Sequence, residues 1–286
     1  MTLKHAYEQG IERLKNAGIP EPQIDAWYLL EYVTGIGRAA YYADPDRQMS
    51  REQSVEYENC LSERSRRVPL QHITGVQEFM GLSFCVNKDV LIPRQDTEIL
   101  VEEALEILKM EGLPSEGGRV RILDLCTGSG CILLSVLHWS DRKIEGVGSD
   151  VSERALMTAK ENARRLNIKS SFVQSDLFEN LTGKYVLILS NPPYIESGRI
   201  ESLQDEVRIH DPLKALDGGE DGLSFYRRII KESKAHLEEG GYLVFEIGCD
   251  QAEAVTDMMR QAGFEGVAVK RDLAGLDRVV YGRYIK

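Results

Sequence analysis

Hydrophobic residues at helical spacing dominate the start of the chain. Apolar side chains recur every three or four positions from Leu3 to Leu14, and the stretch EPQIDAWYLLEYVTG repeats this pattern. A third helix is predicted to begin after Ser50, a favourable N-cap residue, and to end before the breaker Pro69. Residues 1–67 are therefore expected to form an N-terminal helical bundle.

Short β-prone runs separated by glycines follow the bundle. The stretch LQHITGVQEFMGLSFCVN, residues 70–87, predicts a β-hairpin that joins the helical part to the rest of the chain. We expect this connecting segment to occupy residues 68–95. The next helix is predicted to begin near Thr97, with Leu100 and Leu108 on its apolar side.

Strand and helix patterns alternate from Arg119 onward. Five strand candidates stand between amphipathic helix patterns, namely VRILDLC, IEGVGSD, SSFVQSD, YVLILSN and GYLVFEIG. Such alternation is typical of a doubly wound α/β fold with a parallel sheet. Two further strands, at 265–272 and 277–286, are joined so tightly that they are expected to run antiparallel. Residues 96–286 are thus expected to form a seven-stranded, mostly parallel sheet with a reversed last strand.

Composition and charge narrow the class of protein. The chain of 286 residues is 42% hydrophobic and 28% charged, which allows one large core and a smaller one. Because the formal net charge is -11, the surface repels a phosphate backbone on average, and no direct nucleic-acid partner is expected. No apolar run approaches the length of a bilayer, and MTLKHAYEQG lacks the apolar core of a signal peptide. We expect a soluble monomer with no membrane partner.

The cysteines indicate a reducing compartment. Their number, 5, is odd, their positions are scattered, and they form neither a CxxC pair nor a zinc-ligand spacing with histidines. Reduced, buried thiols in a cytoplasmic protein are the simplest interpretation, and no metal site is expected.

A glycine turn, in the sequence LDLCTGSG, directly follows the first strand of the predicted sheet. Open α/β sheets bind ligands at the carboxyl ends of their strands, and such a turn lets the backbone approach a ligand closely. The nicotinamide dinucleotide fingerprint requires a third glycine at a position that Leu133 occupies. The turn therefore indicates a ligand site but weakens the dinucleotide interpretation.

Polar side chains end four successive strands of the predicted sheet. Asp150 is placed to accept hydrogen bonds from both hydroxyls of a ribose, and Asp176 to meet an adenine amino group. Carboxylates repel a diphosphate, so a neutral or cationic nucleoside is favoured, and S-adenosylmethionine is a sulfonium cation. The expected cofactor-binding residues are Asp124, Cys126, Thr127, Gly128, Ser129, Gly130, Asp150, Asp176, Leu177 and Asn191.

The motif SNPPY at the end of the fourth strand adds a resemblance. With the glycine turn, the acidic strand ends and the reversed last strand, it resembles the class I methyltransferase fold, in the variant that methylates planar nitrogens. The match narrows with RRVPLQHITG, VLIPRQDTEILV, DLFENL, ALDGGEDGL, EIGCDQ and DLAGLDRVV. Over nearly the whole chain the sequence resembles the release-factor glutamine methyltransferase family. It departs at Cys126, where the family usually has glycine, and at Gln95 and Asp96, where Pro-Glu is more usual.

This resemblance implies methyl transfer from S-adenosylmethionine to the glutamine of the Gly-Gly-Gln loop in peptide chain release factors, which the helical bundle would grip. A carboxamide nitrogen is a poor nucleophile because its lone pair is delocalised, so both its N–H groups must be held. The Asn191 side-chain oxygen and the Pro192 backbone carbonyl are expected to accept them, the carbonyl being held rigidly because φ of proline is locked. The resemblance also places Tyr194 against the flat face of the amide. These three residues are the expected catalytic groups, Pro193 completes the substrate site, and no metal is needed.

Simpler explanations exist for each motif. NPPY is also typical of a strand that simply ends in a loop. The glycines could serve a tight turn alone, and Asp150 could be only a helix cap. Cys126 and Cys131 are typical of small buried residues near such a turn. The basic cluster at 64–67 is expected to be a solvated helix end, and no role is assigned to Glu246.

Two rival functions stay open. An enzyme that methylates the exocyclic amine of adenine in DNA or RNA uses the same Asn-Pro-Pro-Tyr geometry, but it should carry a basic groove. Residues 1–85 hold 9 Lys and Arg against 12 Asp and Glu, a difference of -3. A non-catalytic scaffold that binds cofactor and release factor is the rival from another class, and the intact NPPY argues against it.

Overall fold

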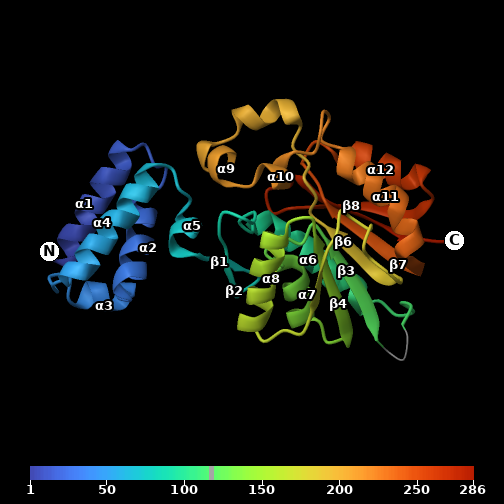
Figure 1. The fold of residues 1–286 in the computed structure, drawn as a ribbon, viewed down its shortest axis with the longest axis horizontal. Coiled ribbons are helices and arrows are strands. Elements are labelled where there is room, and N and C mark those ends of the chain that lie inside the picture. Colours follow the sequence, from blue (N-terminus) through green and yellow to red (C-terminus); the bar gives the residue numbers. More distant parts are fainter. Residues whose placement is uncertain (116–118) are drawn as a thin grey trace. The chain divides into compact units, whose positions relative to one another are not determined.

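The structure, a computed structural model, describes residues 1–115 and 119–286. These residues form two compact units (Figure 1). The first consists of Met1–Val76 and Gln204–His210, and the second of Gln77–Leu203 and Asp211–Lys286. The first unit thus continues past residue 67 and includes a segment from much later in the chain.

Helices build the first unit. Its elements are α1 (Leu3–Asn16), α2 (Pro22–Thr34), α3 (Arg38–Ala43), α4 (Arg51–Ser65), α5 (Leu70–Thr74) and α9 (Asp205–His210). The three predicted helices are confirmed, and Ser50 caps α4 in a reciprocal capping box with Gln53. Helices α3, α5 and α9 span one or two turns each, too short to show a period in the sequence.

Arg64 is buried within this unit, so the expectation of a solvated helix end is wrong for it. The side chain is 7% exposed. Its Nε donates a hydrogen bond to Oδ2 of Asp25 at 2.6 Å, and its Nη2 lies 3.0 Å from Oε1 of Glu206 in α9. Three segments far apart in sequence therefore meet at one guanidinium group.

The second unit contains a seven-stranded sheet in the order β5-β4-β3-β6-β7-β9-β8. Its strands are β3 (Val120–Leu125), β4 (Ile144–Asp150), β5 (Ser171–Gln174), β6 (Tyr185–Ser190), β7 (Leu237–Glu246), β8 (Phe264–Arg271) and β9 (Asp277–Tyr284). Strand β9 pairs antiparallel with both β7 and β8, and the pairs between the first five strands are parallel. The doubly wound fold and the reversed last strand are confirmed. The hairpin of β1 (Val76–Phe79) and β2 (Leu82–Cys85) is confirmed as well.

Helices cover both faces of this sheet (Figure 1). They are α6 (Glu98–Lys109), α7 (Cys131–Trp139), α8 (Glu153–Arg165), α11 (Ser224–His236) and α12 (Ala252–Gln261), with shorter turns η1 (Gln95–Thr97), η2 (Ser197–Ser202) and α10 (Leu213–Leu216). Ile122 of β3 packs with α6 and α7, whereas its neighbour Leu123 packs with α11 and α12. Every residue of β6 is buried, as expected for a central parallel strand. Across the described ranges, every helix is too short or too polar to span a bilayer.

Replacing Arg64 with methionine is expected to destabilise the first unit by about 3–5 kcal/mol, because Asp25 then keeps a buried charge without its partner. Urea denaturation measures this change through the fluorescence of Trp27, which is 3% exposed, in a Trp139→Phe background. Arg13 pairs with Glu58 at the surface, so Arg13→Met is the control and should cost less than about 1 kcal/mol. An unchanged midpoint for Arg64→Met would contradict the role of the buried pair.

Candidate active site

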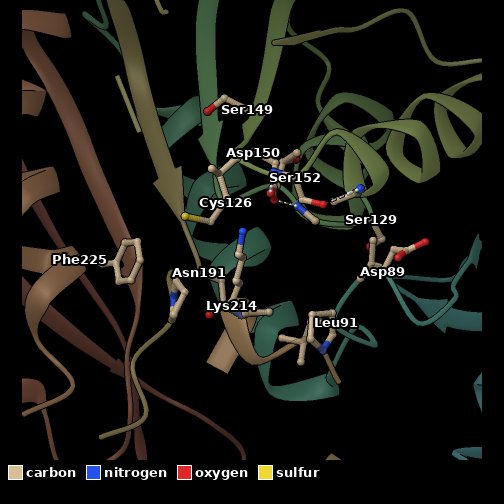
Figure 2. Close-up of a pocket in the computed structure, with 18 of the residues that line it drawn as sticks. Asp89, Leu91, Cys126, Ser129, Ser149, Asp150, Ser152, Asn191, Lys214 and Phe225 are labelled. Atoms are coloured by element: carbon tan, nitrogen blue, oxygen red, sulfur yellow. Dashed lines mark hydrogen bonds between the residues drawn. The ribbon is translucent and has the colours of Figure 1, made fainter. Parts of the chain in front are cut away.

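A cavity of about 740 Å³ opens where the parallel strands end (Figure 2). Parallel pairing of β3, β4, β5 and β6 brings their carboxyl ends to one edge of the sheet. The volume is that of a small-molecule site. The predicted residues that line it are Cys126, Thr127, Gly128, Ser129, Asp150, Asp176, Leu177, Asn191 and Pro193.

Four of the predicted site residues do not line this cavity: Asp124, Gly130, Pro192 and Tyr194. Asp124 is fully buried under the turn, where its Oδ2 accepts a hydrogen bond from the Thr127 hydroxyl at 2.5 Å. Burial raises the pKa of Asp124 to about 7. A Cβ on Gly130 would lie 3.2 Å from the Cβ of Ala159, so this glycine lets α7 approach α8. Direct ligand contact by these residues stays a prediction.

The glycine turn contains a strained non-glycine residue. Cys126 has φ 59°, in the left-handed region, as has Gly128 with φ 54°. A side chain in this region costs roughly 1–2 kcal/mol, which explains why glycine is usual at such a position. The Cys126 side chain lines the cavity, and Figure 2 shows its sulfur on the same side as Asn191 and Phe225. Burial raises the pKa of this thiol, which keeps it protonated.

Asp150 is held by the backbone of two loops. Its Oδ2 accepts a hydrogen bond from Gly128 N at 3.0 Å, and its Oδ1 accepts one from Ser152 N at 2.9 Å. The cap of α8 is Ser152, whose hydroxyl accepts from Ala155 N, so helix capping does not explain Asp150. Each carboxylate oxygen keeps a lone pair for a ligand hydroxyl. The aspartate is therefore fixed in orientation but not saturated.

Several cavity residues were not predicted from the sequence. Two of them belong to α11: Arg228 forms an ion pair with the predicted Asp176 at 3.0 Å, and Phe225 lines the wall. The segment 88–97 forms another wall, and Lys214 extends toward the centre in Figure 2. The quoted motif VLIPRQDTEILV was the one signal for the first of these walls; the others belong to helices whose register could not be derived.

The backbone of the NPPY motif is supported by a second loop that approaches it very closely. A Cβ on Gly218 would lie 2.7 Å from Cα of Tyr194 and 2.9 Å from the Pro193 carbonyl oxygen. The same loop donates a hydrogen bond from Gly218 N to the Ile195 carbonyl at 2.8 Å. Only glycine fits at this position, which explains why the sequence ALDGGEDGL has a glycine at 218.

Tyr194 is held at both its backbone and its hydroxyl. Its carbonyl accepts a hydrogen bond from Nε2 of Gln251 at 2.9 Å, and Oε1 of Gln251 accepts from Gly248 N at 3.0 Å. Its hydroxyl donates to Oε1 of Glu246 at 3.3 Å. The contact of Tyr194 with the flat face of a substrate amide stays a prediction.

The charges around the cavity are mixed. Its lining includes four carboxylates and four basic side chains, namely Asp89, Asp150, Asp176 and Asp217 and Lys88, Arg94, Lys214 and Arg228. Within the described part of the chain, no three His, Cys, Asp or Glu side chains are grouped to hold a metal ion.

Fold and site together define a methyltransferase: a doubly wound sheet with a reversed last strand, a glycine turn, an acidic second strand end and Asn-Pro-Pro-Tyr after the fourth strand. A methyltransferase from Pyrococcus furiosus has a similar fold, with a TM-score of 0.55 and 15% identity, covering 79% of this chain and 100% of that one. The family of the methyltransferase small domain matches residues 102–219.

More similar sequences identify the family. The PrmC N-terminal domain family matches residues 5–75. The release factor glutamine methyltransferase of Caulobacter vibrioides is 41% identical over 99% of this chain and 96% of its own length. That of Clostridium botulinum is 38% identical over 99% of both chains. The chain belongs to the release factor glutamine methyltransferase family.

Replacing Gly218 with alanine is expected to lower the methyl-transfer rate at least about tenfold, because the added methyl group displaces the backbone of Pro193 and Tyr194, which belong to the predicted substrate-holding motif. Gly198→Ala is the matched control, since a Cβ there meets nothing within 4 Å. Single-turnover kinetics separate the two variants. Equal rates for both would show that the Gly218 loop does not position the motif.

Proposed function

We propose that this protein transfers a methyl group from S-adenosylmethionine to the side-chain amide nitrogen of the glutamine in the Gly-Gly-Gln motif of peptide chain release factors. One observation carries the proposal. The Asn191 carboxamide and the Asp150 carboxylate face one cavity of small-molecule size, from strand ends brought together by parallel pairing. In the proposal, Asp150 accepts the ribose hydroxyls and Asn191 accepts the amide N–H.

The cavity fits the proposed cofactor in size and in the chemistry of its walls. Asp150 keeps free lone pairs on both oxygens, as a ribose diol requires. The cavity wall also carries the carboxylates of Asp89, Asp176 and Asp217, of which Asp176 is already paired with Arg228. When bound, the cofactor supplies an electrophilic methyl group. We therefore propose the turn Cys126–Gly130 and the strand ends Asp124, Asp150, Asp176 and Leu177 as its binding residues.

The chain's own task is to hold a weak nucleophile. In the proposal, Oδ1 of Asn191 accepts one N–H of the glutamine amide and the Pro192 carbonyl accepts the other. Both acceptors belong to a segment whose backbone is fixed by Gly218 and Gln251, so little reorganisation is needed during reaction. Orientation and dipoles replace a strong base.

The first unit is the proposed docking site for the release factor. Helix α2 exposes three apolar side chains on one face, Ile24, Tyr28 and Tyr32, with exposed fractions of 41%, 50% and 50%. Spacing of four residues puts them in a line along the helix. Large exposed aromatic side chains are typical of protein interfaces. A cytoplasmic, monomeric enzyme completes the proposal and agrees with five free cysteines.

Mass spectrometry of a release factor incubated with the protein and S-adenosylmethionine tests the reaction. A gain of about 14 Da on the loop glutamine, the mass of a methylene group, would support the proposal and its release-factor substrate. Oligonucleotides that contain adenine are the parallel substrates. Methylation of these alone would favour the nucleic-acid rival, and cofactor binding without any transfer would favour the scaffold.

Asn191→Ala and Asn191→Asp are both expected to lose about a hundredfold or more in turnover, comparable to the loss of one preorganised dipole at a reacting centre. Alanine removes the acceptor. Aspartate keeps it, but its charge stabilises the bound sulfonium before reaction as well as during it. Single-turnover transfer at saturating cofactor measures the loss, with calorimetric titration to verify cofactor binding. Near-normal transfer by the alanine variant would show that SNPPY only ends a strand and has no catalytic role.

Replacing Tyr28 and Tyr32 with serine is expected to raise KM for the intact release factor about tenfold or more, because two interface anchors are lost. The rate with a short Gly-Gly-Gln peptide should not change. Leu273→Ser, which removes a fully exposed apolar side chain from the second unit, is the control. An unchanged KM for the double variant would assign the docking site elsewhere.

A further inference from the structure

Glu246 is a buried carboxyl group beside the NPPY motif with no assigned role. It ends β7, which pairs in parallel with β6, the strand that leads into Asn191. The residue is 2% exposed. Its Oε2 has no hydrogen-bond partner of standard geometry among the described residues. A carboxyl group in this position is costly, so its presence needs an explanation.

Thr97 lies between this carboxyl group and the Asn191 side chain. Its hydroxyl accepts a hydrogen bond from Nδ2 of Asn191 at 3.5 Å. The same hydroxyl is near enough to Glu246 to lower its pKa as a donor. Thr97 is itself 2% exposed and belongs to the cavity wall. The Asn191 contact is long, as catalytic hydrogen bonds often are in a site without ligands.

The direction of hydrogen-bond donation among Glu246, Thr97 and Asn191 decides which end of the Asn191 amide faces the substrate. A carboxylate only accepts, so ionised Glu246 takes the single proton of the Thr97 hydroxyl. Thr97 then has only lone pairs to offer and binds the NH2 group of Asn191. Oδ1 of Asn191 is left for the substrate N–H. With a protonated Glu246, the Thr97 hydroxyl is free to donate to Oδ1, which turns the amide the wrong way round.

We infer that Glu246 and Thr97 are positioning residues that hold the Asn191 amide in its reactive orientation, and that ionised Glu246 is the active form. This inference rests on the proposed function for its kinetic consequence only, since Asn191, Thr97 and Glu246 interact with one another without a substrate.

The groups around Glu246 set its ionisation. Arg278 of β9 favours the carboxylate, whereas Asp96 of η1 disfavours it. The Tyr194 hydroxyl donates to it, and the Tyr226 hydroxyl of α11 donates to its backbone carbonyl. Arg278 divides its own charge between Asp96 and Asp272, at 3.2 and 2.9 Å. Burial outweighs these contacts and raises the pKa of Glu246 to about 7.

Because of this pKa, the inference predicts that the methyl-transfer rate and the stability change in opposite directions with pH. Methyl transfer should rise with pH as Glu246 ionises near pH 7. Stability should change the other way: a folded-state pKa above the unfolded value gives stability that is present at low pH and lost as pH rises through about 7. Glu246→Gln should therefore melt at a higher temperature than the wild type at pH 8, and react more slowly. A purely structural residue would not separate these effects.

Single-turnover methylation between pH 5.5 and 9 is the kinetic test. Glu246→Gln and Thr97→Val are both expected to react about tenfold more slowly at pH 8 and to lose the pH dependence near 7. Cofactor affinity should be unchanged in Glu246→Gln, because Glu246 does not line the cavity. Thr97→Ser keeps the hydroxyl and should stay within about threefold of the wild type, with the same pH profile. Glu103→Gln is the control, since Glu103 is a buried carboxyl group paired with Lys270 and away from the cavity. A wild-type rate and profile in Glu246→Gln would overturn the inference.

A spectroscopic readout separates this inference from the substrate. In protein labelled with ¹⁵N at asparagine and saturated with S-adenosylhomocysteine, the Asn191 side-chain NH2 signals are identified by their absence in Asn191→Ala. They are expected to titrate near pH 7 in the wild type and not in Glu246→Gln. Titration without methylation of the release factor would reject the proposed substrate and leave the positioning chain standing. If these signals do not titrate in the wild type, the inference that Glu246 and Thr97 position Asn191 is overturned.

Discussion

Parallel pairing of the central strands is the constraint on which the site depends. Neighbouring parallel strands end at the same edge, so groups far apart in sequence are brought together without any direct bond between them. Asp150 and Asn191 are connected through β4, β3 and β6 in this way. Because every residue of β6 is buried, Asn191 directly follows a strand that is anchored in the core.

A second constraint acts on the chain where it leaves β6. The NPPY segment has no neighbouring strand beyond Ser190, so its polar backbone groups need other partners. The loop around Gly218 and the amide of Gln251 provide them, at distances that leave no space for a Cβ. The two prolines reduce the number of groups to be satisfied, and the glycines make the support possible.

The sequence predicted the sheet, its helices and the residues of the glycine turn because each has a period or a turn signal of its own. It did not predict that Asp124 lies beneath the turn or that Arg64 is buried, because both depend on partners remote in sequence. Helix α11 ends at His236, since Leu237 pairs with Tyr185 of β6. The short helices and the wall residues Phe225 and Arg228 had no local signal.

The membership of α9 in the first unit limits how modular this protein is. The chain passes between the two units at residue 76, at 203 and again at 210, so neither unit is a continuous cassette. A chimera in which the first 76 residues come from a relative keeps its own Glu206 but places it against the relative's residue at the position of Arg64. Recombination at residue 76 would therefore leave the first unit intact only where residues 1–76 and 204–210 are inherited together. These two segments should have coevolved as a pair.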